Sequence, residues 1–240
     1  MSSQVKDLHQ LRAELYTFLS DAFLEELDEA DLDRFAERAS QDGTDLVPIE
    51  GPELDETAEP FEGTDLLREF GENLQAIDDG ERATLVEDLA AEYASLFLTA
   101  GSKQVNPYES FYLGDEPITN QKPTIVVKNI YEELDYEAAG DHPEPEDHVG
   151  HELAFVAHLC RSAARSHDAG EREYARRYLN LQKEFLEKHL LEWAPDFCAD
   201  VRENTDEPFY EAIALMTEDF LEQEPAMIEY MMELLEDEAS

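Results

Sequence analysis

The chain has 240 residues and a formal net charge of −43, because 60 Asp and Glu residues stand against only 17 Lys and Arg residues. Hydrophobic residues make up 42% of the chain, which is enough for a buried core and argues against disorder. The charge disfavours binding to nucleic acid, since phosphate contacts require a basic patch and none stands out along the sequence.

The acidic residues occur in nearly every segment instead of forming one tail. Such a distribution fits either attraction of a cationic partner or adaptation of the whole surface to high salt. We favour the second interpretation, because the Debye length at molar salt is only about 3 Å and like charges then repel each other little. Local acidity is therefore weak evidence for a site, and we expect the chain to come from a halophile.

The two cysteines, Cys160 and Cys198, show no metal-binding spacing, and Cys160 lies in an apolar run typical of a core. The first residues lack the pattern of a secretory signal. The longest nearly apolar run, residues 153–160, is too short to span a bilayer. We therefore expect a soluble, cytoplasmic protein without membrane insertion.

Helical periodicity dominates the chain, and no alternating strand pattern competes with it. In chain order, the spacing predicts helices over residues 8–23 and 29–40, a helix that begins at Thr64 or Asp65 and ends at Ile77, and a helix between Gly80 and Phe97. It then predicts helices over residues 123–134 and 147–166, and one that begins at Glu171 and ends near residues 193–195. Two further apolar stripes follow, over 209–220 and 227–235. The fold class is an all-α, globular helical bundle of about nine to ten helices with long connecting loops.

Two long segments interrupt the helices. Residues 41–63 are acidic and rich in Pro and Gly, and we expect them to form a surface insertion in a single domain spanning residues 1–240. The second loop, residues 99–122, carries three aromatic residues among five. So much apolar surface argues that this loop is packed and not disordered.

The most informative stretch is a stiff, proline-rich acidic turn that runs into Asp147 and His148, directly before an apolar helix. Asp147 is suited to cap that helix, because its carboxylate can accept the unpaired amide hydrogens of the first turn. His148 and Glu152 stand four residues apart on one helical face, as do Asp147 and His151. Several ionisable groups close together at the start of a helix can indicate a functional site.

Several chemical interpretations of this stretch can be compared. A metal-dependent helical enzyme could use His148 and His151, although the zincin pattern of two histidines around a glutamate is absent. Acid–base catalysis by Asp147 and His148 lacks an identifiable nucleophile, since Ser110 has no placed base. Glycine-rich phosphate loops are also missing. The sequence thus favours a protein that is not an enzyme and needs no cofactor.

Three pairs of segments resemble, in order and spacing, the TorD/DmsD family of cytoplasmic chaperones for molybdenum redox enzymes. They are residues 92–97 with 107–110, residues 144–148 with 152–153, and residues 185–190 with 193–197. The resemblance extends from about residue 8 to about residue 222. It is closer to the TorD/DmsD branch than to the nitrate-reductase branch.

The resemblance implies a chaperone that binds the twin-arginine signal peptide of an apo-molybdoenzyme catalytic subunit, of the DMSO or TMAO reductase type. It also implies support of molybdopterin insertion before export by the twin-arginine translocation (Tat) pathway. The expected form is a monomer or a domain-swapped dimer. By this resemblance the peptide-binding residues are Tyr108, Glu109, Ser110, Tyr112, Asp147, His148 and Glu152.

These residue types suit a twin-arginine peptide. The carboxylates of Glu109, Asp147 and Glu152 could accept two hydrogen bonds from a guanidinium group. Tyr108 and Tyr112 could stack on arginine or on the apolar stretch of the peptide. Two other functions stay open at this stage, the metal-dependent enzyme and a structural subunit of a redox complex.

Overall fold

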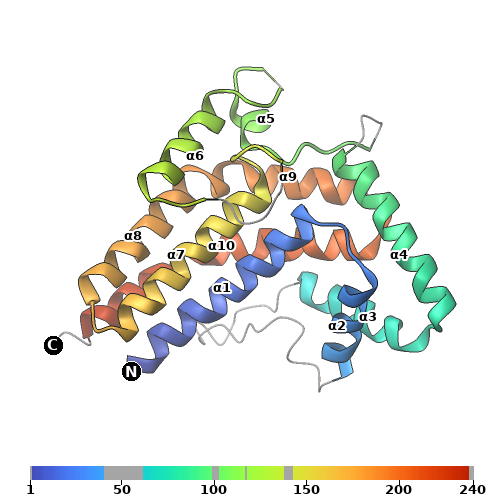
Figure 1. Cartoon of the computed structure of the whole chain (residues 1–240), viewed down its shortest axis with the longest axis horizontal. Helices are drawn as coiled ribbons and strands as arrows, with labels where there is room; N and C mark the ends of the chain where they lie inside the picture. Colours follow the sequence, from blue (N-terminus) through green and yellow to red (C-terminus); the bar gives the residue numbers. More distant parts are fainter. Residues whose placement is uncertain (1, 41–61, 99–102, 117, 138–142, 238–240) are drawn as a thin grey trace.

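The computed structural model describes residues 2–40, 62–98, 103–116, 118–137 and 143–237 (Figure 1). In these ranges it has ten α-helices, one π-helical segment and no strand, which confirms the predicted all-α bundle. The elements are α1 (Ser2–Leu24), α2 (Glu29–Ser40), α3 (Glu62–Ala76), α4 (Asp79–Tyr93), η1 (Ala94–Leu98), α5 (Glu109–Leu113), α6 (Lys122–Glu133), α7 (Val149–Asp168), α8 (Arg172–Lys188), α9 (Leu190–Asn204) and α10 (Pro208–Asp237).

Helix α7 lies at the centre of the bundle, between α1 and α8 (Figure 1). The apolar run predicted for a central helix is almost wholly buried, with Ala154 and His158 keeping partial exposure. Cys160 is a free thiol in this core, as its setting in the sequence predicted. The long buried face of α7 explains why its first turn can be held rigidly.

Helices α1 and α7 approach closely at Gly150. Ser20 Oγ donates a hydrogen bond of 2.8 Å to the carbonyl oxygen of Gly150. A Cβ atom at Gly150 would lie 2.4 Å from Leu24 Cγ and 3.0 Å from the Ser20 carbonyl oxygen. Only glycine therefore allows this contact between the two helices, which lies in the first turn of α7.

Helix α10 contacts α3, α8, α9 and α1. The sequence predicted two separate stripes here, and this division was wrong, because one helix of 30 residues passes through Pro225. Proline removes a single backbone hydrogen bond. The buried face continues across it through Leu221, Glu224 and Ile228, so packing holds the helix together.

The predicted end of α8 near Trp193 and Pro195 was also wrong. The chain breaks at His189, and Pro195 lies inside α9. The side chain of His189 is hydrogen-bonded to Glu109 of α5, and its ring stacks on Phe185 with the centroids 4.7 Å apart. A tertiary contact thus sets this boundary, and the proline does not.

Other boundaries differ less. Helix α2 agrees with its predicted range, while α3 begins at Glu62, two residues before the predicted start. The break between α3 and α4 lies at Asp78, not at Gly80: Asp78 accepts hydrogen bonds from the amides of Gly80 and Glu81, and its own amide donates to the Glu81 carboxylate. Gly80 is therefore part of the first turn of α4.

The second predicted loop contains a helix, α5, and its first half is packed, with Val105, Pro107 and Ser110 buried. The expectation of a packed segment holds for this half, whereas Leu113 and Ile118 in the second half are exposed. Residues 41–61, most of the predicted insertion, lie outside the described residues.

A buried ion pair that the spacing of the sequence does not predict joins α1 to α10. Arg12 Nε donates to Glu224 at 2.7 Å, and Arg12 Nη1 donates to the side-chain oxygen of Gln182 at 2.7 Å. Tyr16 donates a third hydrogen bond of 2.6 Å to Glu224. Both charged side chains are almost fully inaccessible to solvent. The pair therefore fixes how three helices, α1, α8 and α10, sit together.

Candidate peptide-binding site

The backbone brings two distant motifs together. Residues before α5 and before α7 form an antiparallel bridge between Tyr108 and His148. The amide of Glu109 donates to the Asp147 carbonyl at 3.0 Å, and the amide of Val149 donates to the Pro107 carbonyl at 2.8 Å. Two of the segments that carry the sequence resemblance, residues 107–110 and 144–148, are thus in direct contact.

The cap of α7 is His148, and the prediction that Asp147 caps this helix was wrong. His148 Nδ1 accepts a hydrogen bond of 3.1 Å from the amide of Gly150. Asp147 instead turns toward α5, where its carboxylate accepts a 2.9 Å hydrogen bond from the amide of Ser110. The bridge causes this exchange, because it places the start of α5 beside Asp147.

Beneath the bridge, Glu109 and Glu152 form a buried pair of carboxyl groups. His189 Nδ1 lies 3.1 and 3.0 Å from the two carboxylate oxygens of Glu109. Trp193 Nε1 donates a 3.2 Å hydrogen bond to Glu152. Burial raises the pKa of the Glu152 carboxyl well above its ordinary value, and its neighbour Glu109 raises it further. Burial and the neighbouring Glu109 thus favour the neutral, protonated form of the Glu152 carboxyl group.

Some buried polar atoms around this pair have no hydrogen-bond partner within the described residues. They are Ser110 Oγ, Thr124 Oγ1, Tyr131 OH and Asp147 Oδ1. Most buried polar groups in proteins are paired. The base of the site thus has unused hydrogen-bonding capacity on α5, α6 and the start of α7.

The outer side of the site carries tyrosines. Tyr108 and Tyr112 are half-buried, and their hydroxyl groups donate to Glu144 and to Asp200 respectively. The ring of Tyr112 packs on Trp193, with the centroids 5.5 Å apart. These rings present apolar faces and acidic partners at the same surface.

A strip of exposed apolar side chains lies beside the tyrosines, along α5 and α6. Gln121 ties the two helices together, because its side-chain amide donates a 2.8 Å hydrogen bond to the carbonyl oxygen of Ser110. The strip, which we call the α5–α6 strip, consists of Leu113, Ile118, Ile125 and Val126, which are 39–60% exposed. Exposed large apolar groups that lie close together are typical of binding surfaces.

The structure gathers the residues predicted from sequence, but at different depths. Tyr108 and Tyr112 reach the surface, whereas five lie beneath it: Glu109, Ser110, Asp147, His148 and Glu152. In this arrangement the carboxyl groups of Glu109, Asp147 and Glu152 form hydrogen bonds within the protein and do not face solvent.

Sequence reasoning gave no role to His189, Trp193, Tyr131 or Glu144, although all four line the cluster. A signal for the first two existed, because both lie in the third pair of segments that carried the resemblance.

The alternative metal site finds no support in the geometry. The rings of His148 and His151 are 5.9 Å apart and inclined at 66°, and His148 uses one nitrogen as the helix cap. Across the described ranges, no group of three or more His, Cys, Asp or Glu side chains is arranged to hold a metal ion. In the same ranges, no helix has the length and apolar character needed to cross a membrane.

Comparison with known proteins finds relatives along most of the chain. The profile of the nitrate reductase delta subunit family matches residues 63–199, which include α5, α7 and most of α9. The chain is 29% identical over 233 residues to a chaperone protein TorD of Vibrio cholerae, covering 97% of this chain and 99% of that protein. It is 29% identical over 234 residues to a chaperone protein TorD of Shewanella pealeana, covering 94% and 93%.

These relatives are named as chaperones and not as catalysts, which confirms the prediction that the chain is not an enzyme. A crystal structure of an Archaeoglobus fulgidus protein assigned to redox enzyme maturation aligns with a TM-score of 0.51 at 19% identity. The alignment covers 88% of this chain and 93% of that one, and shows that the two share a fold.

Proposed function

The chain belongs to the nitrate reductase delta subunit family, and from this premise we propose that it is a cytoplasmic maturation chaperone for a molybdopterin oxidoreductase. It binds the twin-arginine signal peptide and the apo form of the catalytic subunit, of the DMSO or TMAO reductase type. It holds the subunit until the cofactor is inserted and then releases it for Tat export. The names of the TorD relatives support the chaperone role.

The observation that carries the peptide-binding proposal is the surface of Tyr108, Tyr112 and the α5–α6 strip. A twin-arginine signal peptide offers two guanidinium groups followed by an apolar stretch. The strip suits the apolar part of such a peptide. The tyrosine rings, with Glu144 and Asp200 at their hydroxyl groups, suit the guanidinium groups.

The buried residues have a supporting part in this proposal. Glu109, Ser110, Asp147, His148 and Glu152 join α5 to α7 and α9, and so hold the tyrosines in place. Such rigidity lowers the entropic cost of binding a peptide. Two of their polar atoms, Ser110 Oγ and Asp147 Oδ1, have no hydrogen-bond partner within the described residues.

We propose that residues 1–240 act as one domain, with an acidic insertion at 41–63, as a monomer or a domain-swapped dimer. The net charge of −43 supports a halophilic source. Because salt screens exposed charges, peptide affinity should then rest mainly on apolar contacts and on partly buried charge pairs.

The test is fluorescence anisotropy with a labelled twin-arginine signal peptide in molar salt. Ile125→Glu changes a side chain that is 60% exposed, so the fold should survive, and we expect affinity to fall at least about ten-fold. Tyr174→Glu on α8 is the matched control, since this residue is 55% exposed and lies off the strip. A wild-type protein that does not bind, or equal losses in both variants, would contradict the proposal.

A second arm uses a peptide with lysines in place of both arginines. Lysine cannot offer the planar, two-pronged donor of arginine, so this peptide should bind more weakly. Tyr108→Ala and Tyr112→Ala should reduce the difference between the two peptides, whereas Tyr230→Ala, a half-buried tyrosine on α10, should preserve it.

A further inference from the structure

Basic side chains are concentrated in one part of this acidic molecule. Residues 161–188, which comprise the end of α7 and all of α8, hold seven of the 17 Lys and Arg residues and only five of the 60 acidic residues. The rest of the chain is overwhelmingly acidic. The total charge of the chain conceals this local excess of positive charge.

Three exposed arginines in this region lack an acidic partner among the described residues. Arg161 donates to the hydroxyl of Thr17, and Arg165 donates to that of Ser162 at 3.0 Å. Arg177 has no ion pair in the same described ranges. With more than three acids for every base in the chain, arginines that go without a carboxylate are available for a partner.

The hairpin of α7 and α8 brings these three arginines to one level. Gly170, at a φ of 73°, makes the turn between the two helices. Arg161 and Arg165 are one helical turn apart on α7, and Arg177 lies about 7.5 Å along α8 from its start, level with them. His158 lies on the same face of α7: burial lowers the pKa of its imidazole, and Arg165 and Arg161 lower it further.

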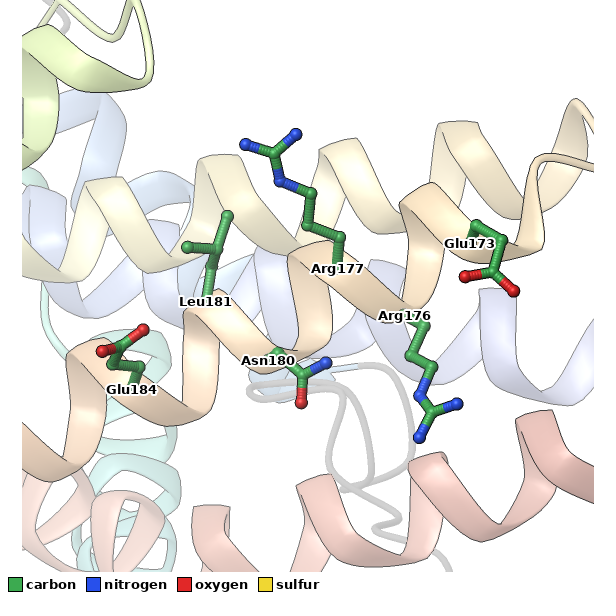
Figure 2. A pocket seen from close by; sticks show the side chains of 6 residues that line it. All are labelled: Glu173, Arg176, Arg177, Asn180, Leu181 and Glu184. Carbon is green, nitrogen blue, oxygen red and sulfur yellow. The ribbon is translucent and has the colours of Figure 1, made fainter.

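Beside the arginines, α8 bears a shallow surface pocket of about 390 Å³. Figure 2 shows that Arg177 and Arg176 project from opposite sides of α8. Arg176 reaches α10, where it lies 3.6 Å from Glu236. The pocket is lined by Glu173, Arg176, Arg177, Asn180, Leu181 and Glu184. It thus combines positive, negative and apolar groups along a single helix.

We propose that this α7–α8 basic face, formed by Arg161, Arg165 and Arg177 with the α8 pocket, docks an acidic helical segment of a partner protein. The three guanidinium groups pair with its carboxylates. Leu181 contacts an apolar side chain, and Asn180 hydrogen-bonds polar groups at the edge. This face is separate from the surface of α5 and α6, so the inference does not rest on peptide binding there.

The mixed chemistry of the pocket favours a protein over a nucleic acid. Glu173 and Glu184 would repel a continuous row of phosphates, whereas a protein helix can place a basic or neutral residue against them. The charge of −43 also repels a long polyanion as a whole. A short acidic segment meets only the local field, because salt screens the more distant charges.

The experiment uses the full chain and a labelled helical peptide of about 20 residues, rich in Glu with Leu at every third or fourth position. Binding is followed by anisotropy at about 0.15 M salt. We expect Arg165→Glu/Arg177→Glu to weaken binding at least about ten-fold. Arg34→Glu/Arg68→Glu makes the same change in net charge on α2 and α3, and should leave affinity within about two-fold.

Four outcomes would overturn the proposal. The wild-type protein could fail to bind the acidic peptide, or the two double variants could lose affinity equally. A single-stranded DNA oligonucleotide could bind with the same dependence on Arg165 and Arg177, which would make the face a nucleic-acid site. A dimer of the unliganded protein that only Arg165→Glu/Arg177→Glu dissociates would identify a second copy of the chain as the occupant.

Discussion

Glu152 shows at the scale of a single residue how position in the sequence and role in the structure differ. The sequence placed it correctly one turn into the helix after Asp147 and His148. It could not show that Glu152 would be fully buried against Glu109 and Trp193, because those contacts come from α5 and α9. Likewise, the choice of His148 over Asp147 as the cap depends on a bridge to a segment about 40 residues earlier.

Glu152 should give stability a distinctive pH dependence. Its pKa is raised in the folded state, so the folded protein keeps a proton that the unfolded chain releases above about pH 4.5. The stabilisation linked to this proton is complete below that pH and is lost as the pH rises through the folded pKa. Glu152→Gln mimics the protonated acid and removes this loss.

We therefore expect the free energy of unfolding of Glu152→Gln, relative to wild type, to rise as the pH increases from about 4.5 to about 8. Urea unfolding at a series of pH values measures this difference. A difference that does not change with pH would show that folding does not raise the pKa of Glu152.

At the scale of helices, the apolar spacing of the sequence predicted well which segments are helical, but predicted poorly where the helices end. The central helix α7 and helix α2 were predicted well, because periodicity is a local property. The ends of α8 and α10 were not, since His189 is held by Glu109, and packing carries α10 through Pro225. Long-range contacts of this kind leave no mark on local spacing.

The buried pair of Arg12 and Glu224 makes the packing of α1 on α10 testable. Arg12→Leu leaves the Glu224 carboxylate buried with only Tyr16 to pair it, and should lower the free energy of unfolding by about 3–5 kcal/mol. Arg12→Leu/Glu224→Leu removes both charges and should recover at least half of that loss. Chemical denaturation measures all three proteins.

The surface pair of Arg68 and Asp65 provides the control, since Arg68→Leu should cost no more than about 1 kcal/mol. If Arg12→Leu/Glu224→Leu is as unstable as Arg12→Leu, the loss of stability comes mainly from the packing of the leucines and not from an uncompensated buried charge.

At the scale of the whole molecule, the sequence gives the net charge directly but does not show how the charges are distributed over the surface. The total of −43 could be counted, but the basic face on α7 and α8 emerges only when the hairpin aligns its arginines. The site shows the same limit. Sequence brought its seven residues into one group, and the fold determined which two reach the surface.

The excess of acid should make stability depend on salt. Raising NaCl from about 0.1 M to about 1 M shortens the Debye length from about 10 Å to about 3 Å and weakens repulsion among the carboxylates. We expect the melting temperature to rise over this range, as measured by circular dichroism. A melting temperature that stays constant or falls would show that self-repulsion does not limit the folded state, and would count against a halophilic source.

The most direct test of the proposed function is a hydrogen-exchange footprint of the bound twin-arginine signal peptide. Mass spectrometry of the full chain, with and without the peptide, should show slower exchange at residues 107–113, 118–131 and 143–148. Those segments carry Tyr108, Tyr112, the α5–α6 strip and the turn before α7. Slower exchange confined to other helices, or no change under conditions where the peptide is bound, would contradict the account.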